Sequence, residues 1–177
     1  GLFSMGASMG LAESGDKIVP NLAEVKPTLL FSVPRIFNRL YDVITKQATE
    51  GPTWKRRLVG AALRNEAHRK KLAADKRTSG FSEFKHTIFD RAVFARVRDR
   101  LGGRLRYAFS GGAAISLEVA ELIDSVGITV YEGYGLTETS PIATANWPGA
   151  RRLGSVGKAI PGVRIEIDRS ATGDPKN

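Results

Sequence analysis

Two glycine-bearing loops, each directly after a stretch of strand character, constrain the fold of this chain more than any other feature. Residues 104–112 alternate polar with apolar side chains and end in two glycines, and residues 128–135 run from β-favouring residues into two more. Between them Ser116 can cap a helix that Gly127 ends. This order predicts a βαβ unit with a right-handed crossover in a mostly parallel sheet.

The two loops are expected to share one crevice. In an open parallel sheet, ligands bind beyond the carboxyl ends of the strands. The loops at residues 110–114 and 131–140 both leave the carboxyl end of a predicted strand. They are therefore placed in one candidate site on topology alone.

The second loop has the residue types that phosphate and metal chemistry need. Thr137 can donate a hydrogen bond to a phosphate oxygen, and Glu138 offers hard anionic oxygen to Mg²⁺. Tyr134 supplies a ring that can lie against a base. A polar turn after a buried strand would use the same residue types, so composition alone leaves both interpretations open.

The remaining segments predict an α/β fold: part of a multi-stranded, mostly parallel sheet with helices on both faces. A short helix at residues 21–25 precedes an apolar run at 28–33, which suits a strand buried on both faces. Pro34 can begin the next helix. The residues of that helix expected to face inward are Ile36, Leu40, Val43, Ile44 and Ala48. The alternation at residues 163–167 predicts a short C-terminal antiparallel β unit within residues 153–177.

Positive charge is concentrated in one segment. The chain has a net charge of +9, and residues 51–106 contain 16 Lys or Arg against 5 Asp or Glu. Residues 52–101 are predicted to form a basic helical insertion of two long amphipathic helices. Such a surface can attract nucleic acid, anionic lipid or an anionic substrate such as coenzyme A, or can be a solvated helix face.

Composition excludes some chemistry. The chain has no cysteine, which rules out disulfides, thiolate metal sites and cysteine nucleophiles. His68 and His86 both lie in the basic segment, away from the glycine loops, and are expected to be helix residues rather than catalysts. No apolar run approaches the roughly 18 to 20 residues that cross a bilayer, and the start lacks the basic flank of a signal peptide, so a cytoplasmic protein is expected.

Four segments resemble motifs of one enzyme family. The hexapeptide at residues 134–139, Tyr-Gly-Leu-Thr-Glu-Thr, resembles the signature of adenylate-forming (AMP-binding) enzymes, specifically the long-chain acyl-CoA synthetases. Residues 110–114 resemble the adenine-side loop of that family, and residues 154–162 its next motif. Residues 33–41 are similar to the segment that these synthetases have ahead of a helical insertion. Residues 1–177 then form a partial adenylation domain, an internal fragment of the large N-terminal domain, with 104–141 as its βαβ nucleotide-site unit.

The resemblance implies an ATP-dependent long-chain fatty acid:CoA ligase. Such an enzyme converts a carboxylate and ATP to an acyl-adenylate and pyrophosphate, and coenzyme A then displaces AMP to give the thioester. By this likeness Thr137 and Glu138 are catalytic: Thr137 holds the α-phosphate, and Glu138 is the Mg²⁺ ligand. Tyr134 stacks on adenine. The residues implied to approach adenine or leave room beside the acyl group are Gly111, Gly112, Ala113, Glu132, Gly133 and Gly135.

Two alternatives stay open, an adenylate-forming ligase with another acceptor such as a carrier protein, and a basic module that binds membrane or nucleic acid. With the ligase, no nucleic acid is expected, while a homo-oligomer and a peripheral contact of the basic helices with the inner face of the membrane remain open. The family's phosphate loop, ribose-binding aspartate and C-terminal catalytic lysine are expected outside this chain, so the fragment alone should not complete the reaction. Residues 172–174 are read as a hairpin turn.

Overall fold

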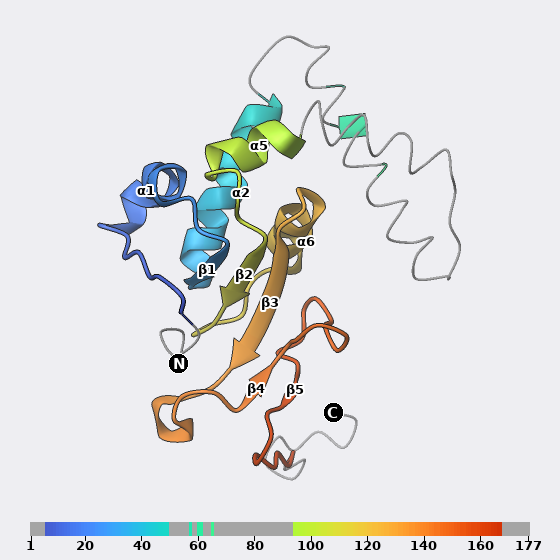
Figure 1. Cartoon of the computed structure of the whole chain (residues 1–177). Coiled ribbons are helices and arrows are strands. Elements are labelled where there is room, and N and C mark those ends of the chain that lie inside the picture. Colours follow the sequence, from blue (N-terminus) through green and yellow to red (C-terminus); the bar gives the residue numbers. More distant parts are fainter. Residues whose placement is uncertain (1–5, 50–56, 58–59, 62–64, 66–93, 168–177) are drawn as a thin grey trace.

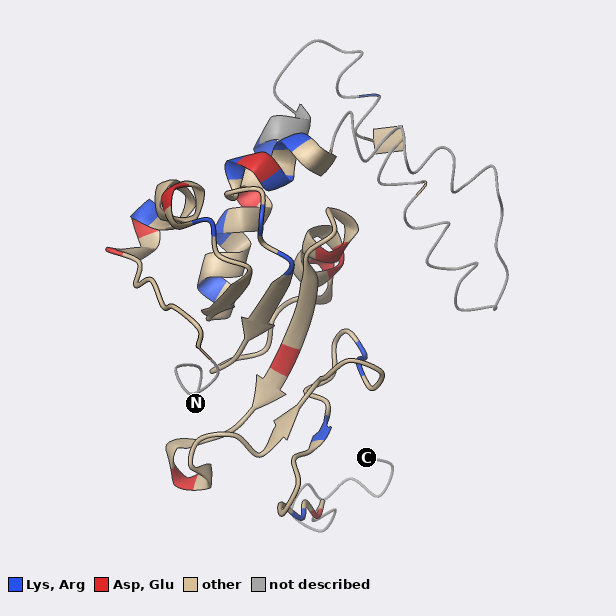
Figure 2. Cartoon of the chain, viewed as in Figure 1, with Lys and Arg blue, Asp and Glu red and all other residues tan. Residues whose placement is uncertain are grey.

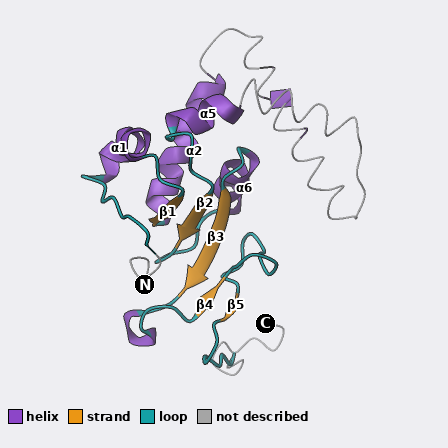
Figure 3. Cartoon of the chain, in the orientation of Figure 1, coloured by secondary structure: helices purple, strands orange, loops and turns teal. Residues whose placement is uncertain are grey.

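A computed structural model describes residues 6–49, 57, 60–61, 65 and 94–167 of the chain (Figure 1). Helices and strands alternate along most of this part (Figure 3). The helices are α1 (Ile18–Val25), α2 (Pro34–Thr49), α5 (Ala95–Arg100) and α6 (Leu117–Ser125), with 3-10 turns η2 (Gly15–Lys17) and η4 (Thr137–Thr139). The strands are β1 (Leu29–Ser32), β2 (Tyr107–Ser110), β3 (Thr129–Tyr134), β4 (Thr144–Ala145) and β5 (Lys158–Ala159).

The five strands form one sheet in the order β1-β2-β3-β4-β5. The first three strands are parallel, and in their register Ser32 lies beside Ser110 and Ser110 beside Glu132. The last two strands are antiparallel, so β3 changes from a parallel neighbour to an antiparallel one between Glu132 and Gly133. The predicted strand-helix-strand unit and the mixed α/β class are both confirmed.

Local sequence signals fix the helix ends. The hydroxyl of Ser116 accepts a hydrogen bond from the backbone N–H of Val119 at 3.3 Å and caps α6, as predicted. Gly127 follows that helix with a φ of +88°, a conformation that disfavours side chains. Gly102 lies just after α5, and a Cβ at this residue would lie 2.3 Å from the Leu22 carbonyl oxygen of α1. Glycine at this position therefore lets the two segments pack closely.

The described helices contribute to a single hydrophobic core against one face of the sheet. Phe37 and Leu40 of α2 are fully buried, as are Ala120 and Ile123 of α6, and the two helices pack against each other. Burying side chains of this size stabilises a fold by roughly 1.5–3 kcal/mol each. The hydroxyl of Tyr41 on α2 also donates to the Glu118 carboxylate of α6 at 2.5 Å.

The other face of the sheet is aromatic. The rings of Phe31 and Phe109 lie 5.6 Å apart, and those of Tyr107 and Tyr131 lie 6.3 Å apart. Phe31 is 56% exposed, so the prediction that residues 28–33 form a strand buried on both faces is wrong for the described chain. An apolar run indicates a strand, but only elements packed on both sides would bury both of its faces.

Several predicted elements differ in extent or position. Helix α1 begins at Ile18 rather than at residue 21, and Phe37, missing from the predicted inward set, is more buried than Ile36. Residues 163–167 are not a strand; the antiparallel unit consists of β4 and β5 instead. Strand β4 pairs with residues 158–159, where the sequence has no alternating pattern that would predict a strand.

Most of the predicted basic insertion lies outside the described residues, as do His68, His86 and residues 172–174. Within the described part, Val97 and Leu101 face the core. Lys and Arg side chains flank α1 at Lys17 and Lys26, and others lie on α2, on α5 and in the segment leading to β2 (Figure 2). None of the described helices is both long enough and apolar enough to cross a membrane.

Candidate functional site

The two glycine loops converge on one pocket at the carboxyl ends of β2 and β3. The pocket has a volume of about 490 Å³. Its lining consists of Phe109, Gly111, Gly112, Gly133, Tyr134, Gly135, Leu136, Thr137, Glu138, Pro141 and Ile142. The topological expectation that the loops face the same crevice is therefore confirmed. Seven of the nine predicted site residues line this pocket; Ala113 and Glu132 do not.

The loop after β3 turns back sharply on itself. A Cβ at Gly135 would lie 1.7 Å from the Pro141 carbonyl oxygen, so the chain can cross itself here only without a side chain. The hydroxyl of Thr139 accepts from the Leu136 backbone N–H at 2.8 Å and closes η4. The Ala143 backbone N–H donates to the Tyr134 carbonyl at 2.9 Å. Thr139, the last residue of the hexapeptide, thus shapes the loop that presents its neighbours.

Thr137 and Glu138 stand exposed on η4 and border the pocket. Among the described residues no ion pair engages Glu138, so its oxygens are accessible to a ligand. The described part of the chain has no group of three or more His, Cys, Asp or Glu that would hold a metal by itself. A single carboxylate fits Mg²⁺, which is usually bound by one or two carboxylates together with substrate phosphates and water.

The first loop offers open backbone to the pocket. A Cβ added at Gly111 would meet no atom within 4 Å, so the missing side chain leaves space rather than relieving a clash. Gly112 has a φ of +81°, which favours glycine. Tyr134 also lines the pocket and is half exposed, so its ring is accessible to a flat ligand.

Glu132 lies on the other side of β3 from the pocket. Successive side chains of a strand point to opposite faces, so Gly133 faces the pocket while Glu132 joins the core face with Val130. Glu132 is only 5% exposed, and its Oε1 accepts from the Gly154 backbone N–H at 3.0 Å. Burial raises the pKa of the Glu132 carboxyl, and the Gly154 N–H and nearby Arg151 oppose this rise. Its side chain therefore holds a loop and does not reach the pocket.

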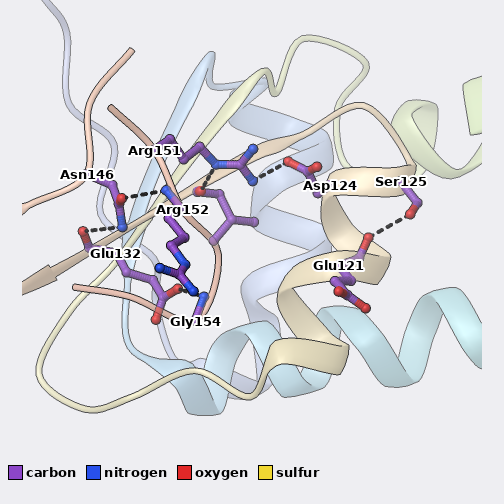
Figure 4. Close-up of polar contacts among 9 residues, drawn as sticks. Glu121, Asp124, Ser125, Glu132, Asn146, Arg151, Arg152 and Gly154 are labelled. Atoms are coloured by element: carbon purple, nitrogen blue, oxygen red, sulfur yellow. Dashed lines mark hydrogen bonds and ion pairs between the residues drawn. The ribbon is translucent and has the colours of Figure 1, made fainter. Parts of the chain in front are cut away.

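Asn146 joins the loop at residues 146–154 to β3 (Figure 4). Its backbone N–H donates to the Glu132 carbonyl at 2.8 Å, and its side-chain Nδ2 donates to the carbonyls of Glu132 and Ser155. Its Oδ1 accepts from the Arg152 backbone N–H at 2.9 Å. Asn146 was not predicted as a site residue, because an asparagine between Ala145 and Trp147 has no local signal of burial.

Arg151 was not predicted either, because its local sequence has no signal of its contacts. Its Nε donates to the Val130 carbonyl at 2.6 Å, its guanidinium pairs with the Asp124 carboxylate of α6, and it lies 5.9 Å above the ring centre of Tyr131. Figure 4 shows this side chain reaching from the 146–154 loop to both β3 and α6. Arg151 thus donates to β3 at Val130, a part of the strand that β4 does not pair with.

Glycines 154 and 157 are structural. Gly154 donates its backbone N–H to Glu132, and a Cβ at Gly157 would lie 2.0 Å from the Ala145 carbonyl oxygen. The hydroxyl of Thr144 donates to the Val156 carbonyl at 2.8 Å and completes the contact between β4 and this segment. Together these contacts brace the outer side of the strand that forms the pocket wall.

A family model and curated relatives both match this chain. A family model described as AMP-binding enzyme matches residues 1–177. Long chain acyl-CoA synthetase 1 of Arabidopsis thaliana is 38% identical over 170 residues, which are 93% of this chain and 24% of that protein. A long-chain-fatty-acid–CoA ligase of Mycobacterium bovis is 33% identical over 166 residues, 93% of this chain and 27% of that protein. The solved benzoate CoA ligase of Burkholderia xenovorans LB400 gives a TM-score of 0.49 at 20% identity, over 91% of this chain and 23% of its own.

Proposed function

The chain belongs to the AMP-binding enzyme family, and we propose that it is the central part of the adenylation domain of an ATP-dependent long-chain fatty acid:CoA ligase. It spans about a quarter of the length of the curated relatives it matches. Those relatives are long-chain acyl-CoA synthetases and fatty-acid CoA ligases at 30–38% identity. The activity, the fatty acid, ATP and coenzyme A therefore belong to the proposal for the whole protein.

The observation that carries the proposal is the convergence of both glycine loops on a pocket whose lining combines polar and apolar side chains. Thr137 and Glu138 supply polar groups, while Phe109, Pro141 and Ile142 provide apolar surface. A ligand that joins a phosphate or carboxylate to an apolar group matches this lining. An acyl-adenylate is such a molecule.

The first step of the reaction is the attack of a fatty acid carboxylate on the α-phosphate of ATP, which releases pyrophosphate. Negative charge builds on the phosphate oxygens as the new bond forms, and a fixed donor is worth most where that charge develops. Thr137 and Tyr134 both line the pocket; in this proposal the Thr137 hydroxyl donates to such an oxygen and Tyr134 stacks on the adenine. Gly111 and Gly112 allow the base to approach their peptide groups.

Glu138 is the residue proposed to hold Mg²⁺, with the remaining positions of the metal left to phosphate oxygens and water. The bound ion would neutralise charge on the triphosphate. Coenzyme A is the proposed acceptor of the acyl group in the second step. The pocket residues address adenylation only, so a carrier protein as acceptor is the competing proposal.

We also propose that the protein is cytoplasmic, with a peripheral contact between its Lys- and Arg-rich segment, residues 51–106, and the inner face of the membrane. Anionic vesicles should bind the full-length protein in a salt-sensitive manner if this contact exists. Binding that is equal for neutral vesicles would contradict it.

The ligase proposal is tested with the full-length protein by pyrophosphate release from ATP in the presence of palmitate. Glu138→Gln should slow this release by about 10²- to 10³-fold if the carboxylate acts as one preorganised charge contact. Glu166→Gln is the matched control, because Glu166 is exposed, lies outside the pocket and pairs only with the nearby Arg164 among the described residues. Equal rates in both variants would contradict the proposed role of Glu138.

The same assay separates the competing proposals. Palmitate-dependent pyrophosphate release that proceeds to a thioester only with coenzyme A supports the ligase. Release that leads to acylation of a carrier protein and not of coenzyme A supports the alternative acceptor. Membrane or nucleic-acid binding that survives Thr137→Ala, with no affinity for ATP, would identify a binding module instead.

A further inference from the structure

Phe109 is held in place by two neighbours on the aromatic face of the sheet. It is the third residue of β2 and lies in register beside Tyr131 of β3. Its ring packs against Phe31 with centres 5.6 Å apart. On the other side, a Cβ at Gly133 would lie 2.6 Å from Cζ of Phe109 and 3.0 Å from Cε1. The ring therefore occupies the place that any side chain at residue 133 would take.

The same ring forms one wall of the pocket. Phe109 belongs to the pocket lining, and the apolar residues Leu136, Pro141 and Ile142 line it too. Leu136 and Ile142 are 49% and 39% exposed. Large apolar side chains around a concave site favour an apolar ligand group there.

The surface behind the ring is also apolar. Phe31 and Tyr107 lie on the same sheet face as Phe109, and both are about half exposed. A smaller side chain at residue 109 would thus join the pocket to a continuous aromatic surface. Because Phe109 packs between Phe31 and Gly133, it does not yield this space by a small rotation; only truncation opens it.

We propose that Phe109 is a specificity-determining residue that limits the size of the apolar group the pocket accepts. This inference rests on the proposed function, since it takes the apolar group to be the acyl part of the substrate. Phe109 acts by contact with that group and takes no part in proton or phosphoryl transfer. Its replacement should therefore change the preference among acids more than the affinity for ATP.

The test uses the full-length protein and a matched set of carboxylic acids: straight-chain saturated acids of increasing length and one phenyl-bearing acid with the carbon number of one of them. Pyrophosphate release gives kcat/KM for each acid, and ATP affinity is measured separately. Phe109→Ala should raise the ratio of the phenyl-bearing to the matched straight-chain acid by about tenfold, the scale that differences of a methylene or more reach in apolar pockets. Phe109→Trp should shift preference toward shorter acids.

Tyr107→Ala is the matched control, because Tyr107 lies two residues earlier on the same strand and face but outside the pocket lining. Its acid preference should equal that of the wild type. Should Phe109→Ala fail to fold, Phe109→Leu gives the same comparison with a smaller loss of packing. An unchanged ratio in a folded Phe109 variant that binds ATP normally would overturn the inference.

Failure of the proposed function gives a different result. If the wild-type protein shows no acid-dependent pyrophosphate release, the ligase proposal itself is contradicted. If the wild type is active and Phe109→Ala loses activity equally with every acid, the ligase proposal stands and the residue has only a packing role.

Discussion

The backbone carbonyl of Glu132 accepts two hydrogen bonds from Asn146, one from its backbone N–H at 2.8 Å and one from its side-chain Nδ2 at 3.4 Å. The remaining side-chain bonds of Asn146 reach Ser155 and Arg152. One buried asparagine thereby joins the strand of the pocket wall to the loop behind it.

Replacing Asn146 should cost more than its small size suggests. Asn146→Ala leaves the buried carbonyl of Ser155 and the N–H of Arg152 without their partner, and we expect a loss of about 2–3 kcal/mol in the free energy of unfolding. Urea denaturation of the full-length protein measures it. Asn38→Ala on the exposed side of α2 is the control and should change stability by less than about 0.5 kcal/mol.

Glu132→Gln should remove a pH dependence of stability. Burial raises the pKa of Glu132 above its ordinary value of 4.5, so the folded state binds the proton more tightly than the unfolded state. The stability from this group is complete below pH 4.5 and is lost as the pH rises through the higher folded pKa. Glutamine keeps an acceptor for Gly154 without a charge.

The stability of Glu132→Gln relative to wild type should therefore increase from pH 4.5 toward neutrality. Chemical denaturation at a series of pH values gives this difference. A difference that stays constant across that range would show that the buried carboxyl is not the source.

Replacing two pocket glycines by alanine should have different effects, on stability at Gly135 and on ligand binding at Gly111. At Gly135 the added methyl would overlap the Pro141 carbonyl, so the turn must open, and we expect a loss of about 1–3 kcal/mol in stability. At Gly111 the methyl meets nothing, so Gly111→Ala should fold normally but place a methyl in the pocket.

Thermal unfolding and ATP titration separate these two effects. Gly111→Ala should weaken ATP binding with an unchanged melting temperature, whereas Gly135→Ala should lower the melting temperature itself. Normal ATP affinity in Gly111→Ala would argue against a ligand at that loop.

Arg151 and Asp124 should show strong coupling. The side chains are 22% and 14% exposed, so removing the arginine leaves a largely buried carboxylate beside α6. We expect Arg151→Ala to lose about 2–3 kcal/mol, somewhat less than the cost of breaking a fully buried pair. In a double-mutant cycle, Arg151→Ala with Asp124→Asn should lose less than the sum of the single changes. Additive losses would show that the contact to Val130 dominates.

The parallel unit and its two loops were predictable because their signals are local. Alternation, the Ser116 cap and the glycines each act within a few residues, and strand topology then brings the loops together. The contacts of Asn146 and Arg151 join residues 6 to 27 positions apart, and no local pattern marks them. The burial of Glu132 has a local cause that the prediction overlooked: strand alternation sends its side chain to the face opposite Gly133, although both residues belong to the 131–140 loop.

The exposure of Phe31 could not be predicted from its apolar segment either. Burial of a sheet face depends on which helices pack there, and the described helices share one core on the opposite face. The 158–159 strand likewise depends on β4, whose two residues form a pair too short for any periodic signal.

The change of neighbour along β3 affects the carbonyl oxygen of Gly133. Carbonyl directions alternate along a strand, and the carbonyls of Glu132 and Tyr134 point toward β4, so that of Gly133 points toward the β2 side. Strand β2 ends at Ser110, which pairs with Glu132, so β2 has no residue in register with Gly133. The main chain thus offers the pocket an acceptor that no side-chain replacement removes. Alanine scanning would be blind to this contact, and a ligand analogue lacking the matching amino group would be the way to detect it.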